Sequence, residues 1–237
     1  MPESAKTARV GTATVRIALT MAPANDHDEP LEATLQDGTR VGFRPIQPED
    51  KHWLQRGIEE MSPESRYRRF FAPVDHLTED QLRYFTEVDQ VDHVAWLATL
   101  ADARDHRVVA VARFIRIPGR PDAAEAAVTV IDEYQGRGLG RAMLVVLTRQ
   151  AIASGIKRFT MFVLGENKAM LALLHDAGAT SESAHDGVYQ FQVELPARLE
   201  DLDESAAPRV LRVAAAGKLR GEVAPGQFWT RFLVGKQ

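Results

Sequence analysis

The segment from Val128 to Arg141 joins a β-branched run to three closely spaced glycines, a pattern that can bind an anionic group. It reads Val128-Thr-Val-Ile-Asp-Glu-Tyr-Gln135-Gly-Arg-Gly-Leu-Gly140-Arg141. Glycines let backbone N–H groups approach an anion closely, and the free N–H groups at the start of a helix attract a pyrophosphate. Arg137 and Arg141 would strengthen this attraction. The segment therefore predicts a phosphate-binding turn between a strand and a helix.

Two other phosphate-binding loops do not fit the spacing of these glycines. A dinucleotide fingerprint requires G-x-G-x-x-G, whereas the glycines here are at 136, 138 and 140 and position 141 is arginine. A Walker loop requires G-x-x-x-x-G-K followed by Ser or Thr, and the sequence contains no such string. The spacing therefore argues against both nucleotide-binding classes.

The spacing resembles the pyrophosphate-binding loop of the GNAT acetyltransferase superfamily, which has Arg or Gln, x, x, Gly, x, and Gly or Ala. Gln135, Gly138 and Gly140 occupy its defining positions. Three upstream segments look like the catalytic domain of bacterial protein-lysine acetyltransferases that modify acyl-CoA synthetases: Asp37-Gly-Thr-Arg-Val, Arg44-Pro-Ile-x-Pro-Glu-Asp50 and Ser62-Pro-Glu-Ser-Arg-Tyr-x-Arg-Phe-Phe71. The resemblance covers residues 33 to 196.

This resemblance implies acetyl-CoA as the cosubstrate and no metal. It implies that the pantetheine arm contacts the main chain of the cofactor strand, where a backbone N–H would polarise the thioester. Asn167 matches an asparagine that commonly contacts the same arm, although a helix N-cap would select Asn equally well. The expected cofactor-binding residues are Val128, Thr129, Val130, Gln135, Gly136, Arg137, Gly138, Leu139, Gly140, Arg141 and Asn167.

The resemblance also implies a catalytic base. In this subfamily the acidic residue just before the Val-x-Val of the cofactor strand is the proposed catalytic glutamate, and Glu125 stands there. A lysine-type amine, whose ordinary pKa is about 10.4, must lose a proton before it attacks a thioester. Burial near the end of an apolar strand would raise the pKa of Glu125 toward a useful value. A solvent-facing strand residue is the alternative interpretation.

A general acid is not assigned. Many members of the superfamily have a tyrosine seven residues after the asparagine, where this sequence has Leu174. His175 is adjacent, but one step along a helix turns it about 100° away. We therefore expect the departing thiolate to take its proton from solvent.

These features predict direct acetyl transfer from acetyl-CoA to an amine. The resemblance favours a protein lysine as the acceptor, for example on an acyl-CoA synthetase. Two alternatives stay open: acetylation of a small amine such as an aminoglycoside, polyamine or amino acid, and a catalytically silent CoA-binding regulatory module. The formal net charge of −4 and the pI near 6.0 argue against a nucleic-acid partner.

The composition limits the other classes of function. No apolar run approaches the roughly 18 residues that span a bilayer, so we expect no membrane partner and a cytoplasmic protein. The chain has no cysteine, which excludes disulfides, a thiolate nucleophile and the commonest zinc sites. Its seven histidines lack close metal-ligand spacing. The sequence does not indicate an oligomeric state.

Hydrophobic periodicity predicts the elements that position these residues. Strands are expected at 39–46, 93–100, 107–117, 123–131, 158–164 and 188–195, and helices are expected to begin near 48, 62, 78, 139 and 167. The first strand is expected at an edge of the sheet because Pro45 and Pro48 stop it. The expected fold is a GNAT-like α/β (α+β) domain, with a mixed, mainly antiparallel sheet flanked by helices. The resemblance adds a splay between the two central strands.

The chain is expected to have three parts: an N-terminal arm or linker at 1–32, the acetyltransferase domain at 33–196, and a C-terminal extension of unknown role at 197–237. Because the arm is short, we expect no fused regulatory nucleotide-binding domain of the kind that some relatives have. Residues 206–220 have the spacing of one more helix. Arg66, Arg68 and Arg69 fall within about one turn, and a solvated helix face is the preferred interpretation over contact with an acidic partner.

Overall fold

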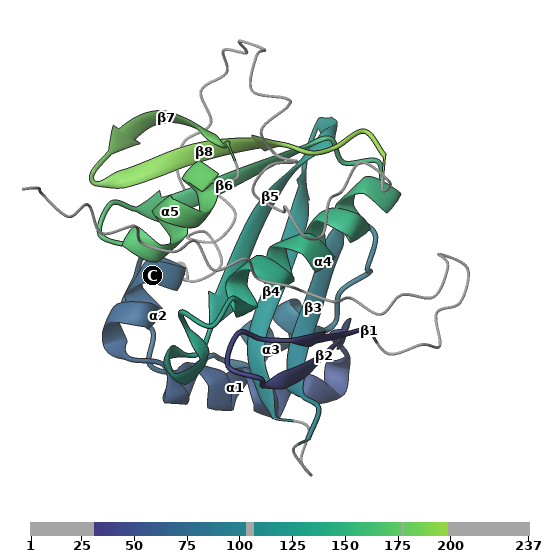
Figure 1. Cartoon of the computed structure of the whole chain (residues 1–237), viewed down its shortest axis with the longest axis vertical. Coiled ribbons are helices and arrows are strands. Elements are labelled where there is room, and N and C mark those ends of the chain that lie inside the picture. Colours follow the sequence, from purple (N-terminus) through teal and green to yellow (C-terminus); the bar gives the residue numbers. More distant parts are fainter. Residues whose placement is uncertain (1–30, 103–106, 177, 199–237) are drawn as a thin grey trace, which may run out of the picture.

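A mixed sheet of eight strands forms the centre of the computed structural model, which describes residues 31–102, 107–176 and 178–198 (Figure 1). The strands are β1 (Leu31–Thr34), β2 (Arg40–Pro45), β3 (His93–Leu100), β4 (Val108–Ile117), β5 (Arg120–Val130), β6 (Arg158–Leu164), β7 (Thr180–His185) and β8 (Val188–Glu194). The helices are α1 (Lys51–Glu60), α2 (Pro63–Phe70), α3 (Glu79–Thr86), α4 (Leu139–Ala153) and α5 (Lys168–Asp176), with single 3₁₀ turns at Pro48–Asp50 and Asp132–Tyr134. The predicted helix at 206–220 and most of the two predicted terminal segments lie outside the described residues.

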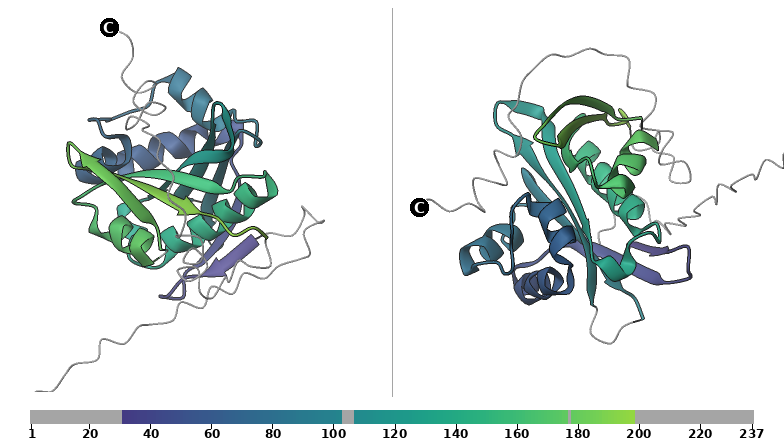
Figure 2. Two further views of the ribbon diagram at one scale, coloured as in Figure 1. Left: turned by 90° about the horizontal axis from the view of Figure 1, so that it is seen from above. Right: turned by 90° about the vertical axis from the view of Figure 1, so that its left-hand side faces the viewer.

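The strand order is β1-β2-β3-β4-β5-β6-β8-β7, and all neighbours are antiparallel except β5 and β6. Helices α1 to α3 lie on one face of the sheet, and α4 and α5 lie on the other (Figure 2). The largest fully buried side chains include Phe114 of β4, Phe159 of β6, and Leu139, Met143 and Leu147 of α4. The expected mixed, mainly antiparallel sheet flanked by helices is confirmed.

Each predicted strand and helix of the described region is present, but two strands were not predicted. β1 is only four residues long and begins ahead of the expected start of the domain at residue 33. β7 reads Thr-Ser-Glu-Ser-Ala-His and carries an irregularity between Glu182 and Ala184. Both escape detection because a short or polar segment has no apolar alternation, and its strand geometry comes from pairing with a neighbour.

The expected edge position of β2 is wrong, because β2 lies between β1 and β3. β1 pairs with β2 only from Arg40 to Phe43, so Pro45 lies beyond the end of that ladder. The N–H of Ile46 donates to the carbonyl of Ala95 in β3 at 3.0 Å, and by alternation the Pro45 nitrogen faces the other side. The missing N–H therefore interrupts no ladder.

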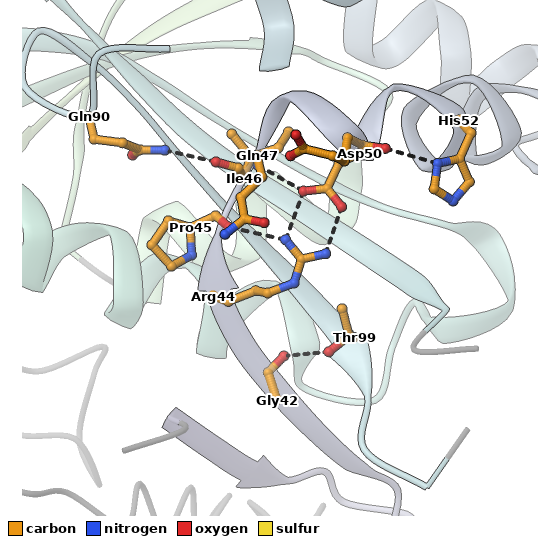
Figure 3. Close-up of polar contacts among 10 residues, drawn as sticks. Gly42, Arg44, Pro45, Ile46, Gln47, Asp50, His52, Gln90 and Thr99 are labelled. Carbon is orange, nitrogen blue, oxygen red and sulfur yellow. Dashed lines mark hydrogen bonds and ion pairs between the residues drawn. The ribbon is translucent and has the colours of Figure 1, made fainter. Parts of the chain in front are cut away.

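The Arg44 to Asp50 motif fixes the first helix against the sheet. Arg44 donates two hydrogen bonds to the Asp50 carboxylate, at 2.7 and 2.6 Å, and the Gln47 N–H donates to the same carboxylate at 2.8 Å (Figure 3). Asp50 is buried, and its hydrogen bonds raise the pKa of Arg44 against the opposing effect of burial. The motif thus joins β2 to the 3₁₀ turn that leads into α1.

Helices α2 and α3 begin at the predicted caps. The Ser62 hydroxyl accepts from the Ser65 N–H at 3.2 Å with Pro63 next in sequence, and Thr78 forms a reciprocal capping box with Gln81. Local sequence therefore specifies where the helices that cover one face of the sheet begin.

None of the helices in the described ranges has the length and apolar character of a membrane span.

Candidate active site

The two central strands separate partway along their length. β5 and β6 are paired only from Ala123 with Arg158 to Glu125 with Thr160, although β5 continues to Val130 and β6 to Leu164. A cavity of about 420 Å³ opens where the pairing stops. Its lining includes Glu125 to Val130 of β5, Met161 to Val163 of β6, and residues of α2, α5 and the glycine-rich loop. The parallel pair thus gives the sheet the splay that was expected.

The separated part of β5 directs main-chain groups into this cavity. The Ile131 N–H donates to the Val109 carbonyl of β4 at 3.1 Å. Because N–H and C=O groups alternate in direction along a strand, those of Val128 and Val130 point away from β4 and toward the gap. The Gln135 amide donates to the Val130 carbonyl at 3.0 Å, as this direction requires. The backbone of β5 can therefore bind an extended ligand.

The glycine-rich loop closes one end of the cavity. Gly136 and Gly138 have φ angles of 72° and 91°, in the left-handed region that side chains disfavour. Gly138 is the N-cap of α4, so the first free N–H groups of a 15-residue helix emerge here. Gly136, Gly138, Gly140 and Arg141 line the cavity. The loop has the geometry of an anion-binding helix start.

Gln135 and Asp132 brace this loop against α2. Gln135 Nε2 donates to Asp132 Oδ1 at 3.0 Å and to Ser65 Oγ at 3.3 Å, and the Ser62 N–H donates to Asp132 Oδ2 at 2.9 Å. Burial raises the pKa of Asp132, but hydrogen bonds from Ser65 and Ser62 outweigh it and the pKa is lowered. An ionised carboxylate therefore joins the start of α2 to the loop.

The side chains of Arg137 and Leu139 are not among those that line the cavity. Arg137 bonds Asp37 in the β1–β2 turn at 2.8 Å and lies 4.8 Å from the ring centroid of Tyr134. Leu139 is buried in the core. Arg141 differs from Arg137, because it lines the cavity and its closest described acid, Asp176, is 3.9 Å away. Of the two loop arginines, only Arg141 is placed to meet a ligand.

Asn167 follows β6 and lies at the start of α5. Its Oδ1 accepts from the Met170 N–H at 3.1 Å, which is an N-cap interaction. Asn167, Met170 and Leu173 also line the cavity, so capping and ligand contact are compatible. Leu174, in the position of the absent tyrosine, is buried and offers no proton.

Glu125 lies where β5 and β6 part, with only 4% of its surface exposed. The alternative of a solvent-facing residue is therefore wrong. Arg69 of α2 lines the same cavity. Burial lowers the pKa of Arg69 to about 10, and the attraction of Glu125 opposes this shift. The preferred solvated face for the three arginines is wrong for Arg69, because helix α2 turns that side chain toward the sheet.

A buried arginine, Arg113, lies near enough to Arg69 for the two charges to repel each other. Arg113 of β4 is 3% exposed; its Nη1 donates to the Phe85 carbonyl at 3.2 Å, and its guanidinium lies 4.7 Å from the Phe85 ring centroid. Burial, and then repulsion from Arg69, lower the pKa of Arg113 to about 9. The same Nη1 is 3.2 Å from Nε2 of His93, which must be the acceptor because arginine only donates. Burial and Arg113 lower the pKa of His93 to about 3, so its ring is neutral.

Sequence reasoning missed Arg69 and Arg113 as residues of the site. One signal existed: Arg113 interrupts the apolar run Val-Val-Ala-Val-Ala-Arg-Phe-Ile of β4, and a charge in such a run needs a buried partner. Arg68, also on α2, lines the cavity while bonded to Glu64. In the described part of the chain, no group of three or more His, Asp or Glu side chains could hold a metal ion.

Comparison with known proteins gives a consistent family and a similar acetyltransferase. Residues 61–179 match the acetyltransferase (GNAT) family. The chain is 35% identical over 167 residues to acetyltransferase Pat of Mycolicibacterium smegmatis, covering 70% of this chain and 49% of that protein. It therefore spans about half the length of this relative.

Two solved structures are similar as well. The GNAT domain of S. lividans PAT is 33% identical with a TM-score of 0.65, over 70% of this chain and 97% of that one. A cAMP-binding acyltransferase from Mycobacterium smegmatis is 29% identical with a TM-score of 0.53, over 80% of this chain and 56% of that one. With its splayed sheet and glycine-rich loop, the chain belongs to the acetyltransferase (GNAT) family.

Proposed function

We propose that this protein transfers the acetyl group of acetyl-CoA directly to an amine, with Glu125 as the general base. One observation carries the proposal: Glu125 is buried at the point where β5 and β6 separate, in the same cavity as the glycine-rich loop. The proposed proton acceptor and the anion-binding loop are thus joined by β5, whose main-chain groups at Val128 and Val130 face the cavity.

The cavity suits an extended, anionic cosubstrate such as acetyl-CoA. The N–H groups around Gly136 to Gly140, with Arg141 beside them, fit a pyrophosphate. The main chain at Val128 and Val130 fits the amides of a pantetheine arm, and Thr129 and Asn167 complete the walls of the cavity. Apolar walls from Met161, Val163 and Leu173 would exclude water from the thioester end.

The transfer then needs few protein groups. Glu125 takes a proton from the incoming ammonium group, directly or through one water. The neutral nitrogen attacks the thioester carbonyl carbon, the C–N bond forms, the C–S bond breaks, and the thiolate takes a proton from solvent. A backbone N–H of β5 stabilises the charge on the carbonyl oxygen. No covalent enzyme intermediate is required.

A protein lysine is the proposed acceptor, in a cytoplasmic protein whose acetyltransferase domain spans residues 33–196. The acceptor is supported by the subfamily resemblance and by the similarity to proteins named Pat. A small amine is the second candidate acceptor, because the proposed chemistry requires only an amine that can lose a proton to Glu125.

The experiment compares thiol release from acetyl-CoA by the wild type and Glu125→Gln, with acyl-CoA synthetases and a panel of small amines as acceptors. We expect kcat to fall by about 10² to 10⁴ in Glu125→Gln, because base catalysis is lost, while the Kd for acetyl-CoA stays within about twofold. Glu59→Gln, on the exposed surface of α1, is the matched control. Full activity of Glu125→Gln would refute its role as base, and turnover with small amines alone would replace the protein acceptor.

A further inference from the structure

Arg69 and Glu125 come from distant parts of the chain but line one cavity. In the β4–β5 ladder Glu125 is opposite Ile115, so Arg113, two residues before Ile115, projects from the same face of the sheet. Arg113 bonds the Phe85 carbonyl of α3, which shows that this face is the one covered by α1 to α3. Glu125 is therefore directed toward the helices that carry Arg69, and away from α4.

The charged and titratable groups around Glu125 come from α2, α3, β3, β4 and β6, and Arg68 of α2, which lines the same cavity, is paired with Glu64. Arg69 of α2 attracts Glu125, and Arg113 of β4 repels Arg69. Burial raises the pKa of Tyr84 of α3, Arg113 opposes this shift and Glu125 adds to it, so the phenol is neutral. His93 of β3 is also neutral. From β6, Thr160 lies opposite Glu125 and carries no charge, while Arg158 is bonded to Glu194 of β8 at 2.6 Å.

We propose that Arg69 is a positioning residue that keeps Glu125 ionised and directed into the cavity, so that a buried carboxylate can act as a base at neutral pH. The inference rests on the proposed function, in which Glu125 accepts the proton. Burial alone favours the protonated acid, which cannot accept a proton. A guanidinium beside it reverses that preference, and it remains charged across the physiological range.

Arg113 adds a second positive charge near Glu125, but unlike Arg69 it does not line the cavity. Two guanidinium groups and one carboxylate give the cluster a positive formal charge, which disfavours a further cation in the cavity. An acceptor ammonium group that enters is thereby favoured to lose its proton.

The test is the pH dependence of kcat/KM for Arg69→Met and Arg69→Lys. Methionine suits the site because an apolar cavity of about 60 Å³, with Ile58, Leu77 and Phe85 in its wall, adjoins Arg69. In Arg69→Met the acid limb of the profile should move up by about one pH unit or more, so the loss of rate is larger at pH 6 than at pH 9. Arg69→Lys keeps the charge and should leave the limb near its wild-type position.

Arg66→Met is the matched control on the same helix. Arg66 pairs with the exposed Asp75 at 3.1 Å and does not line the cavity, so its loss should not move the acid limb. A merely structural role for Arg69 would lower the rate by the same factor at every pH, and that result would overturn the inference. If Glu125→Gln abolishes turnover while the limb of Arg69→Met is unmoved, the proposed function stands and the inference fails.

A second measurement tests the inference even if Arg69→Met folds poorly. The double variant Arg69→Met/Glu125→Gln should then have a higher thermal unfolding midpoint than Arg69→Met alone, because it no longer buries an uncompensated carboxylate. An equal or lower midpoint for the double variant would show that Arg69 does not balance the charge of Glu125.

Discussion

The two sides of the cavity offer different kinds of chemical group to a ligand. On the loop side, the groups available to a ligand are mainly backbone: the main chain of β5, the glycines of the loop and the first turn of α4. On the side covered by α1 to α3, they are side chains, with Glu125 and Arg69 in front of Arg113 and His93. The loop side is specified within one contiguous segment, whereas the other side requires four elements to pack together.

This difference predicts different sensitivities to substitution. Backbone groups persist through most side-chain changes and are lost only when the backbone angle itself changes. A cluster of buried charges depends on each of its members, because removal of one leaves another without compensation. The expected effects below test this contrast, from the largest to the smallest.

Replacement of a loop glycine should disrupt cofactor binding through the backbone alone. Gly136 has a φ of 72° with nothing within 4 Å of an added Cβ, so Gly136→Ala strains the backbone without a clash. We expect the Kd for acetyl-CoA to rise about tenfold or more, measured by calorimetry, because relief of the strain moves the loop N–H groups.

The matched control is Gly119→Ala in the β4–β5 turn, where φ is 76° and the Cβ again meets nothing. Both variants should lose about 1 kcal/mol of folding stability. Only Gly136→Ala should weaken binding. Equal affinities in the two variants would mean that the loop backbone does not bind the cosubstrate.

The side-chain cluster should make folding stability sensitive to acid. Burial lowers the pKa of folded His93 to about 3, while an unfolded histidine titrates near 6.5. Between these values the unfolded chain binds more protons, so this contribution to stability is full above about pH 6.5 and falls as the pH drops toward 3. We expect a loss from this group that approaches about 1.4 kcal/mol per pH unit in that window.

Denaturant unfolding at several pH values measures this contribution. His93→Gln, whose side-chain oxygen can still accept from Arg113, should show a shallower decline than the wild type between pH 6 and 4. His52→Gln on α1, whose ring nitrogen bonds only a local carbonyl at 3.0 Å, serves as the control and should follow the wild type. Parallel curves for wild type and His93→Gln would contradict a buried neutral histidine.

The smallest effect is expected for Arg137, despite its place inside the motif. Arg137 is turned to Asp37 and Tyr134, so Arg137→Ala should change the Kd for acetyl-CoA by less than about twofold. Arg141→Ala, at a residue that lines the cavity, should raise the Kd by about fivefold, with the difference shrinking as salt is added. A larger effect of Arg137→Ala than of Arg141→Ala would reverse this assignment.

The sequence by itself determined the local elements and the motif. Ser62 and Thr78 specify helix starts because capping depends on residues within one turn, and apolar periodicity specifies the long strands and α4. The spacing of Gln135, Gly138 and Gly140, together with the family resemblance, was enough to expect the loop and the mixed sheet. These features depend on near neighbours in the chain.

Only the tertiary structure decided which side chains share the site. Arg69 and Arg137 both appeared in basic segments, but packing places the first in the same cavity as Glu125 and turns the second to the β1–β2 turn. Tertiary pairing also made strands of β1 and β7, because a neighbouring strand supplies their hydrogen bonds. Such outcomes depend on contacts between residues far apart in sequence. A local sequence pattern does not encode the energies of those contacts.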